Sequence, residues 1–173
     1  CILTNNVDAA YEYLSKFSKL QRMVLNNSSK EFITLSSELE MLRLYLSLES
    51  LRFSQSFTYN IDVDNIDTNE VYLASMLIQP YVENAIWHGL RNKQGEKMIS
   101  IFCKEEDGKL KIIIDDNGIG RQKAAMIKAQ KIGYQQHESK GTVLTEERMK
   151  LLSLKYQAAV YVEIIDKMNE NDE

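Results

Sequence analysis

The sequence predicts an α+β fold in which a helical N-terminal segment precedes a part that mixes strands and helices. Residues 1–79 contain neither glycine nor proline, whereas all seven glycines lie between Gly89 and Gly141 and the single proline is Pro80. A segment without these residues that is rich in Leu, Glu, Ser and Lys favours long helices. Beyond it, short alternating or β-branched runs bounded by glycine-containing turns indicate strands.

Two long helices are expected in the N-terminal part. Apolar side chains recur at three- and four-residue spacing over 7–26, which predicts an amphipathic helix. A second helix is expected near 36–54, with Thr34 or Ser36 as its N-cap. Its two leucine stripes favour contacts on two sides, for example with another helix of the chain and with a partner subunit; one broad core-facing surface is the alternative. The stripes are Leu35, Leu39, Leu42 and Leu46, and then Leu44, Leu48 and Leu51.

The rest of the chain is predicted from local patterns. Alternation of apolar and polar residues predicts strands, and Glu106-Asp107-Gly108 has the composition of a hairpin turn. A polar, irregular segment is expected over 121–140. The elements expected in chain order are a strand over 57–63, a helix over 70–91 that Pro80 interrupts, strands over 98–105 and 109–114, a helix over 145–156 and a last strand over 160–165.

The composition excludes several classes of function. The formal net charge of −4 argues against a general nucleic-acid-binding protein, since neutralising phosphates requires a basic surface. No run approaches the roughly 20 apolar residues that span a membrane, and no signal peptide follows Cys1. A chain that begins with cysteine is interpreted as part of a longer protein, whose other segments could include membrane spans. Cys1 and Cys103 have no metal-ligand spacing, and a reducing compartment fits them best.

The end of the strand at 109–114 is the first candidate site. The chain continues there as Asp115-Asp116-Asn117-Gly118-Ile119-Gly120. This places a carboxylate at the mouth of a cleft, beside backbone that can approach a ligand closely. An ordinary turn is the alternative interpretation.

The helix over 77–91 is the second candidate site, because its surface is chemically divided. At about 100° per residue, Ile78, Val82, Ala85 and Ile86 share an apolar face, and Tyr81, Asn84, His88 and Arg91 share a polar one. Asn84 offers an oxygen ligand for Mg²⁺, and His88 and Arg91 offer hydrogen-bond donors for phosphate. An amphipathic helix with a solvent-facing side is the alternative.

A third candidate is Ser139-Lys140-Gly141-Thr142, just ahead of the helix expected from Thr145. Small residues before a helix leave backbone N–H groups free to bind anions, and Lys140 adds a positive charge.

The order of these three pieces resembles the GHKL ATP-binding family, which includes histidine kinases, gyrase B, the ninety-kilodalton heat-shock chaperones and MutL. Glu83–Gly89 is similar to the family's N box, Asp116–Gly120 to its G1 box, and Ser139–Thr142 to a degenerate G2 box. The resemblance covers roughly 55–166. Within the family, the chain resembles the LytS-type sensor histidine kinases. The stretches that carry this closer resemblance are Leu77–Ile86, Glu147–Leu152, and Leu39–Phe53, which is similar to a second dimerisation helix.

The resemblance implies a two-layer α/β sandwich of the GHKL type over 55–173, preceded by a helical dimerisation segment over 1–54. It also implies ATP and Mg²⁺ as ligands. In the implied site, Asn84 coordinates Mg²⁺ with Glu83 assisting beside it, and His88 and Arg91 contact phosphate. Asp116 accepts a hydrogen bond from the adenine amino group, and Gly118 and Gly120 let backbone pack on the nucleotide. Gly141 and Thr142 cradle phosphates with Lys140 as an extra contact, and 121–140 forms a lid.

The chain departs from the family pattern at three places. Ser139-Lys140-Gly141 replaces the usual Gly-x-Gly, which weakens the expectation of a tight phosphate loop. Pro80 stands where gyrase-like members have the glutamate that activates water, so a kinase is favoured over a free ATPase. The only histidines are His88 and His137, and neither has the neighbours of a phosphoacceptor. We therefore expect the acceptor upstream of Cys1, and one further strand after 160–165.

These expectations combine into one function. The chain is expected to be the ATP-binding part of a two-component sensor histidine kinase, which passes the γ-phosphate to an upstream histidine and then to a response regulator aspartate. It should bind ATP without phosphorylating itself. The expected partners are a second copy, through the N-terminal helices, and a receiver domain; the expected location is the cytoplasmic side of a membrane-bound bacterial sensor. The alternatives are a pseudokinase or dimeric scaffold with the same fold, and a standalone GHKL ATPase.

Overall fold

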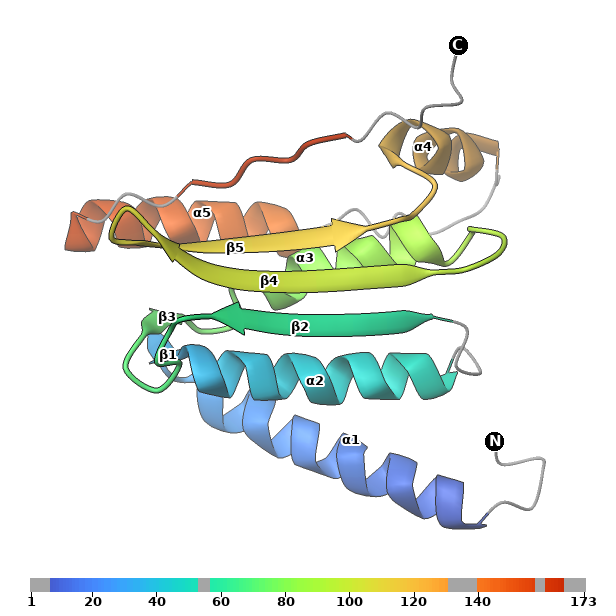
Figure 1. Cartoon of the computed structure of the whole chain (residues 1–173), viewed down its shortest axis with the longest axis horizontal. Helices are drawn as coiled ribbons and strands as arrows, with labels where there is room; N and C mark the ends of the chain where they lie inside the picture. The colour runs from blue at the N-terminus through green and yellow to red at the C-terminus, as the bar shows by residue number, and fades with distance from the viewer. Residues whose placement is uncertain (1–6, 53–56, 131–139, 158–160, 167–173) are drawn as a thin grey trace.

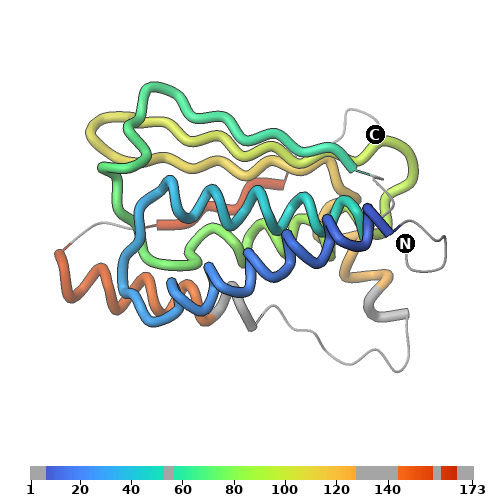
Figure 2. Tube along the Cα trace, turned by 90° about the horizontal axis from the view of Figure 1, so that it is seen from below, coloured from blue at the N-terminus to red at the C-terminus, as the bar shows by residue number. Residues whose placement is uncertain are grey.

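A computed structural model describes residues 7–52, 57–130, 140–157 and 161–166. The longer strands and the helices form two layers, which Figure 2 shows with these strands above and the helices below, and Figure 1 labels the elements. The elements are α1 (Val7–Ser28), β1 (Phe32–Thr34), α2 (Leu35–Arg52), β2 (Thr58–Asp64), β3 (Tyr72–Ala74), α3 (Gln79–Asn84), the π-helix η2 (Ala85–Leu90), β4 (Met98–Glu106), β5 (Lys109–Asp116), α4 (Arg121–Gln130) and α5 (Lys140–Tyr156).

The main sheet has three strands in the order β2-β4-β5. Strand β2 runs parallel to β4, and β4 runs antiparallel to β5 with Ile101 opposite Ile114. Asp107 and Gly108 both have positive φ, 53° and 71°, which is the conformation that a two-residue hairpin turn requires. Strands β1 and β3 form a separate antiparallel pair. The α+β prediction is confirmed, and the hairpin lies where the sequence places it.

Helix α2 packs on both of its sides within the chain. Its first leucine stripe, Leu35, Leu39, Leu42 and Leu46, is buried in one core with the inward residues of the sheet and of α3 and η2. A second cluster joins Met41 and Leu48 of α2 to Leu20 of α1, and Figure 2 shows α1 lying along α2. Two packing faces were predicted and are present: one lies in the core with the sheet, and the other lies against α1, a helix of the same chain. The core also joins residues on both sides of the division expected after residue 54.

The helix expected over 70–91 is shorter, so that prediction was wrong in its first part. Residues 72–74 form β3, the chain turns over 75–78, and the helix begins only at Gln79. Met76 has a positive φ of 56°, which no helix accommodates. Pro80 lies in the first turn of α3, where its missing N–H costs nothing. It therefore starts this helix and does not interrupt it.

Three predictions in the second half of the chain also need correction. Residues 121–130 form α4, although an irregular segment was expected, because most of them are good helix formers such as Arg, Gln, Lys, Ala and Met. Helix α5 begins at Lys140 and not at Thr145. Residues 161–166 run alongside β5 (Figures 1 and 2) but are not assigned to the sheet. Within the described ranges, no helix is long and apolar enough to cross a membrane.

Candidate functional site

Helix α3 and the π-helix η2 form one continuous helical rod that carries the polar residues predicted for the site. The backbone N–H of Arg91 bonds to the carbonyl of Ile86 at 2.9 Å, a five-residue step typical of a π-helix. The wider turn breaks the regular spacing on which the predicted polar face depends. Burial and then the nearby Glu146 of α5 raise the pKa of the Tyr81 hydroxyl.

Asn84 is the last residue of α3 and is partly exposed. Its side chain makes no hydrogen bond to another residue that the structure describes, so its amide oxygen is uncommitted within that part of the chain. Mg²⁺ bound to a nucleotide usually takes one or two protein oxygens and fills its other positions with phosphates and water. A single amide at this place fits that requirement. The described residues contain no group of three or more His, Cys, Asp or Glu that could hold a metal by themselves.

Asp116 and the turn after it are packed tightly against η2. A Cβ atom on Gly118 would lie 2.4 Å from the Cα of Gly89, and a Cβ on Gly89 would lie 2.5 Å from Oδ1 of Asp116. Both distances are far below van der Waals contact, so only two glycines allow this approach. The N–H of Gly118 donates to Oδ1 of Asp116 at 2.9 Å, and the N–H of Ile119 donates to the carbonyl of Gly89 at 3.1 Å. The turn and the helix therefore form one unit.

Further hydrogen bonds fix the turn to β4. Asn117 and Met98 exchange two of them: the N–H of Asn117 bonds to the carbonyl of Met98 at 3.1 Å, and the N–H of Met98 bonds to Oδ1 of Asn117 at 2.9 Å. The Lys93 ammonium bonds to the carbonyl of Asn117 at 2.5 Å. Gly120 then adopts a left-handed φ of 77° and its carbonyl accepts a bond from Ala124 in α4. The segment expected to form a lid thus starts from a fixed point.

The other predicted residues of the α3–η2 rod have partners within the protein. The Glu83 carboxylate accepts a 2.8 Å bond from Gln79. It also lies near α2, where its charge contributes to raised pKa values of Tyr45 and Glu49 after the larger effect of burial. Arg91 is exposed, and its guanidinium lies 4.9 Å from the centre of the Trp87 ring. His88 is partly exposed on η2.

The third predicted piece is only partly described. Lys140, Gly141 and Thr142 form the first turn of α5, so they belong to the helix and do not precede it. Ser139 and His137 lie outside the described residues. The structure thus brings Asp116 and Gly118 onto the rod that carries Asn84 and His88, and it gives no relation between them and the side chains of 140–142.

Three residues of this arrangement were not assigned a role from the sequence. Gly89 follows His88 directly, and its glycine pairing with Gly118 is visible only in space. Lys93 and Asn117 act by bonding to backbone, which leaves no periodic pattern. The available signal was the concentration of all glycines between Gly89 and Gly141.

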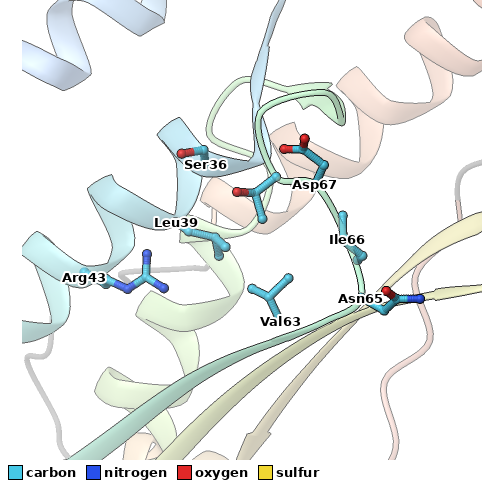
Figure 3. Close-up of a pocket in the computed structure, with 8 residues that line it drawn as sticks. Ser36, Leu39, Arg43, Val63, Asn65, Ile66 and Asp67 are labelled. Atoms are coloured by element: carbon cyan, nitrogen blue, oxygen red, sulfur yellow. The ribbon is translucent and has the colours of Figure 1, made fainter.

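A separate groove lies between α2 and the segment after β2 (Figure 3). It has a volume of about 500 Å³ and is lined by Ser36, Leu39, Arg43, Val63, Asn65, Ile66, Asp67 and Thr68. None of the predicted site residues lines it. Its mixture of one guanidinium, one carboxylate and short polar groups does not resemble a nucleotide site.

The arrangement of helices on one sheet, with an Asp-Asn-Gly turn fixed to an Asn-bearing helix, allows comparison with known families. Residues 1–57 match the family model described as "Histidine kinase". The mixed helix-and-sheet architecture is consistent with an α+β histidine kinase fragment.

The chain is a homologue of the protein named "Sensor histidine kinase/phosphatase LytS". It is 35% identical over 150 residues to the proteins of that name from Staphylococcus aureus strains Mu50 / ATCC 700699 and N315. The match covers 86% of this chain but 26% of each relative, so the chain spans about a quarter of the length of the relatives it matches. The predicted resemblance to LytS-type sensor kinases is confirmed.

Proposed function

We propose that this chain is the ATP-binding part of a two-component sensor histidine kinase. In the whole kinase, the γ-phosphate of ATP passes to a histidine outside residues 1–173 and then to an aspartate of a response regulator. The observation that carries the proposal is the close packing of Gly118 and Asp116 on Gly89, which holds the acidic turn against the helix that bears Asn84. The homology to LytS supports the same reaction class.

Each side chain has a distinct part in the proposed site. Asp116 accepts a hydrogen bond from the adenine amino group. Asn84 holds Mg²⁺, which supplies charge neutralisation for the phosphates. His88 and Arg91 donate hydrogen bonds to phosphate oxygens, and Glu83 supports the adjacent Asn84 through its bond with Gln79.

The backbone and the following segment complete the proposed site. Gly118 and Gly120 bring main chain close to the nucleotide, and 121–140, which begins with α4, closes over it as enzyme lids do. Lys140, Gly141 and Thr142 meet the phosphates at the start of α5. Catalysis then rests on positioning and on electrostatic stabilisation of the transferred group. Pro80 in the first turn of α3 removes the carboxylate that a hydrolytic ATPase would use.

The proposed partners are a second copy of the chain and a response regulator receiver domain. The side of α1 that faces away from α2 exposes Val7, Tyr11, Leu14 and Leu25, which are 61–77% exposed. A helix normally covers such apolar side chains, so we propose that α1 contributes to a homodimer. The chain is placed on the cytoplasmic side of a membrane-bound sensor, where receiver domains and ATP are found.

Calorimetric titration with ATP and Mg²⁺ tests the proposal. The wild-type chain should bind ATP. Asp116→Asn should lose most of the affinity, because the Asn side chain has one acceptor oxygen where the carboxylate has two. Asp115→Asn is the matched control, since residue 115 points to the opposite face of β5. If the wild-type chain does not bind, the fold serves as a scaffold and the pseudokinase alternative is correct. Labelled ATP should leave no stable phosphate on His88 or His137.

A further inference from the structure

The turn over 75–78 is the place where α1, α2, α5 and the connection between α1 and β1 meet the start of α3. Ser75 is 1% exposed, and each of its polar groups is used. Its N–H donates to the carbonyl of Glu31 at 3.2 Å, and its hydroxyl donates to the carbonyl of Asn27 at the end of α1 at 2.8 Å. Its carbonyl accepts a 2.7 Å bond from Arg148 of α5. Helix α2 contributes Glu38.

Glu38 is the most buried acidic residue of the described chain, with 0% exposure. Its two carboxylate oxygens accept bonds from the N–H groups of Met76 and Ile78, each at 3.0 Å. Ile78 is the N-cap residue of α3, and the N–H groups at the start of a helix have no partner within the helix. Met76 lies two residues earlier, in the turn that leads to the helix. Burial raises the pKa of the Glu38 carboxyl, and the N–H groups of residues 76–79 oppose that rise. A carboxylate in an apolar core is retained at a cost, which is offset only by well-formed hydrogen bonds.

These bonds determine where the helix starts. Met76 adopts a φ of 56°, a conformation that costs about 1–2 kcal/mol for a residue with a side chain. The carboxylate of Glu38 binds on both sides of this residue and so stabilises the bend. Asn84 follows Ile78 by six residues in a single unbroken helix, about 9 Å along its axis. A shift of the turn therefore moves Asn84 by a similar amount.

Helix α2 also contacts the far part of the same rod. The Arg52 guanidinium lies 4.4 Å from the centre of the Trp87 ring on η2. The two contacts, at Glu38 and at Arg52, lie near opposite ends of α2 and near opposite ends of the α3–η2 rod. The rod is thus fixed against sliding along α2, while its Gly89 end is fixed to Asp116.

We propose that Glu38 is a positioning residue for the phosphotransfer: by holding the 75–78 turn it sets the place of Asn84 relative to Asp116. This inference rests on the proposed function of the site. In this role Glu38 aligns Asn84, the proposed Mg²⁺ ligand, with Asp116, the proposed adenine acceptor. Glu38 itself touches neither ligand.

The test compares Glu38→Gln with Glu40→Gln, the same change at an exposed position of α2 whose side chain pairs with Lys19. Affinity for ATP is measured with Mg²⁺ and with EDTA. Glu38→Gln should lower the Mg²⁺-dependent gain in affinity by about 10- to 100-fold, the range typical when a residue that orients a metal ligand is changed, and should leave affinity in EDTA unchanged. Glu40→Gln should change neither. Equal loss in both conditions, or no loss in either, would overturn the inference.

Hydrogen exchange without nucleotide gives a second, independent readout. Glu38→Gln should speed exchange of the amides of residues 76–84 and leave the β4–β5 hairpin unchanged, whereas faster exchange throughout would mean a purely structural role. Glu38→Asp, with one methylene fewer, is measured in parallel in case the Gln variant does not fold. If the wild-type chain binds no ATP, the proposed function fails and the role in phosphotransfer fails with it, while the exchange pattern still shows whether Glu38 holds the 75–78 turn.

Discussion

Replacing Gly118 with alanine should separate the acidic turn from η2. The added Cβ would lie 2.4 Å from Cα and 2.6 Å from the carbonyl carbon of Gly89. Both neighbours are backbone atoms, so the clash is relieved only if the turn moves away. Overpacking of this kind costs about 1–3 kcal/mol. Loss of the 3.1 Å bond from Ile119 to Gly89 adds about 1 kcal/mol. The free energy of unfolding should therefore fall by about 2–4 kcal/mol.

Urea unfolding followed by fluorescence measures this loss, because Trp87 is the only tryptophan and lies on η2. Gly95→Ala is the control: Gly95 has a φ of 77°, but nothing lies within 4 Å of its Cβ position. It should lose about 1–2 kcal/mol through backbone strain alone, with no change in ATP affinity. Gly118→Ala should weaken ATP binding as well. A Gly118→Ala protein that is as stable as Gly95→Ala, and that keeps full affinity for ATP, would refute the reasoning.

Two further predictions concern the core. Leu42 is 1% exposed in the core that α2 shares with the sheet, so Leu42→Ala should lower the free energy of unfolding by about 2–5 kcal/mol. Leu25 is 69% exposed on α1, so Leu25→Ala should change the free energy of unfolding little. Similar effects of the two changes in urea unfolding would contradict this packing. Burial raises the pKa of the Cys103 thiol to about 11, so at pH 8 a thiol reagent should modify Cys103 of a Cys1→Ser protein only after guanidinium is added. Rapid labelling of the native protein would show that Cys103 in β4 is accessible to solvent.

The strands of the main sheet and the acidic turn could be predicted because their signals are local. The runs before and after Asp107-Gly108 alternate between two faces, and a hairpin needs only neighbouring residues to form. The Asp116 turn carries its own glycines. For the same reason the motif order was enough to indicate the LytS-type kinases. What these patterns could not provide was the partner of each face, as the second stripe of α2 illustrates.

The missed features depend on residues far apart in the chain. The bend at Met76 is stabilised by Glu38, and no sequence pattern within residues 70–78 predicts this bend. The start of α4 was missed for another reason: Arg121–Gln130 has good helix formers but little apolar periodicity, so a reading based on amphipathic pattern treats it as irregular. The packing of Gly118 on Gly89 was also missed, because it joins two segments that are distant in sequence and each glycine matters only through its contact with the other.

The parallel pairing of β2 with β4 has a consequence for the order in which the molecule folds. Strands β4 and β5 are joined by a two-residue turn and can pair within microseconds. Strand β2 can join them only after the chain has closed a crossover that contains β3, α3 and η2, and closing such a loop costs entropy before any contact repays it. We therefore expect the strand that leads to Asp116 to form early, and the helix that bears Asn84 to be fixed in place only when the sheet is completed.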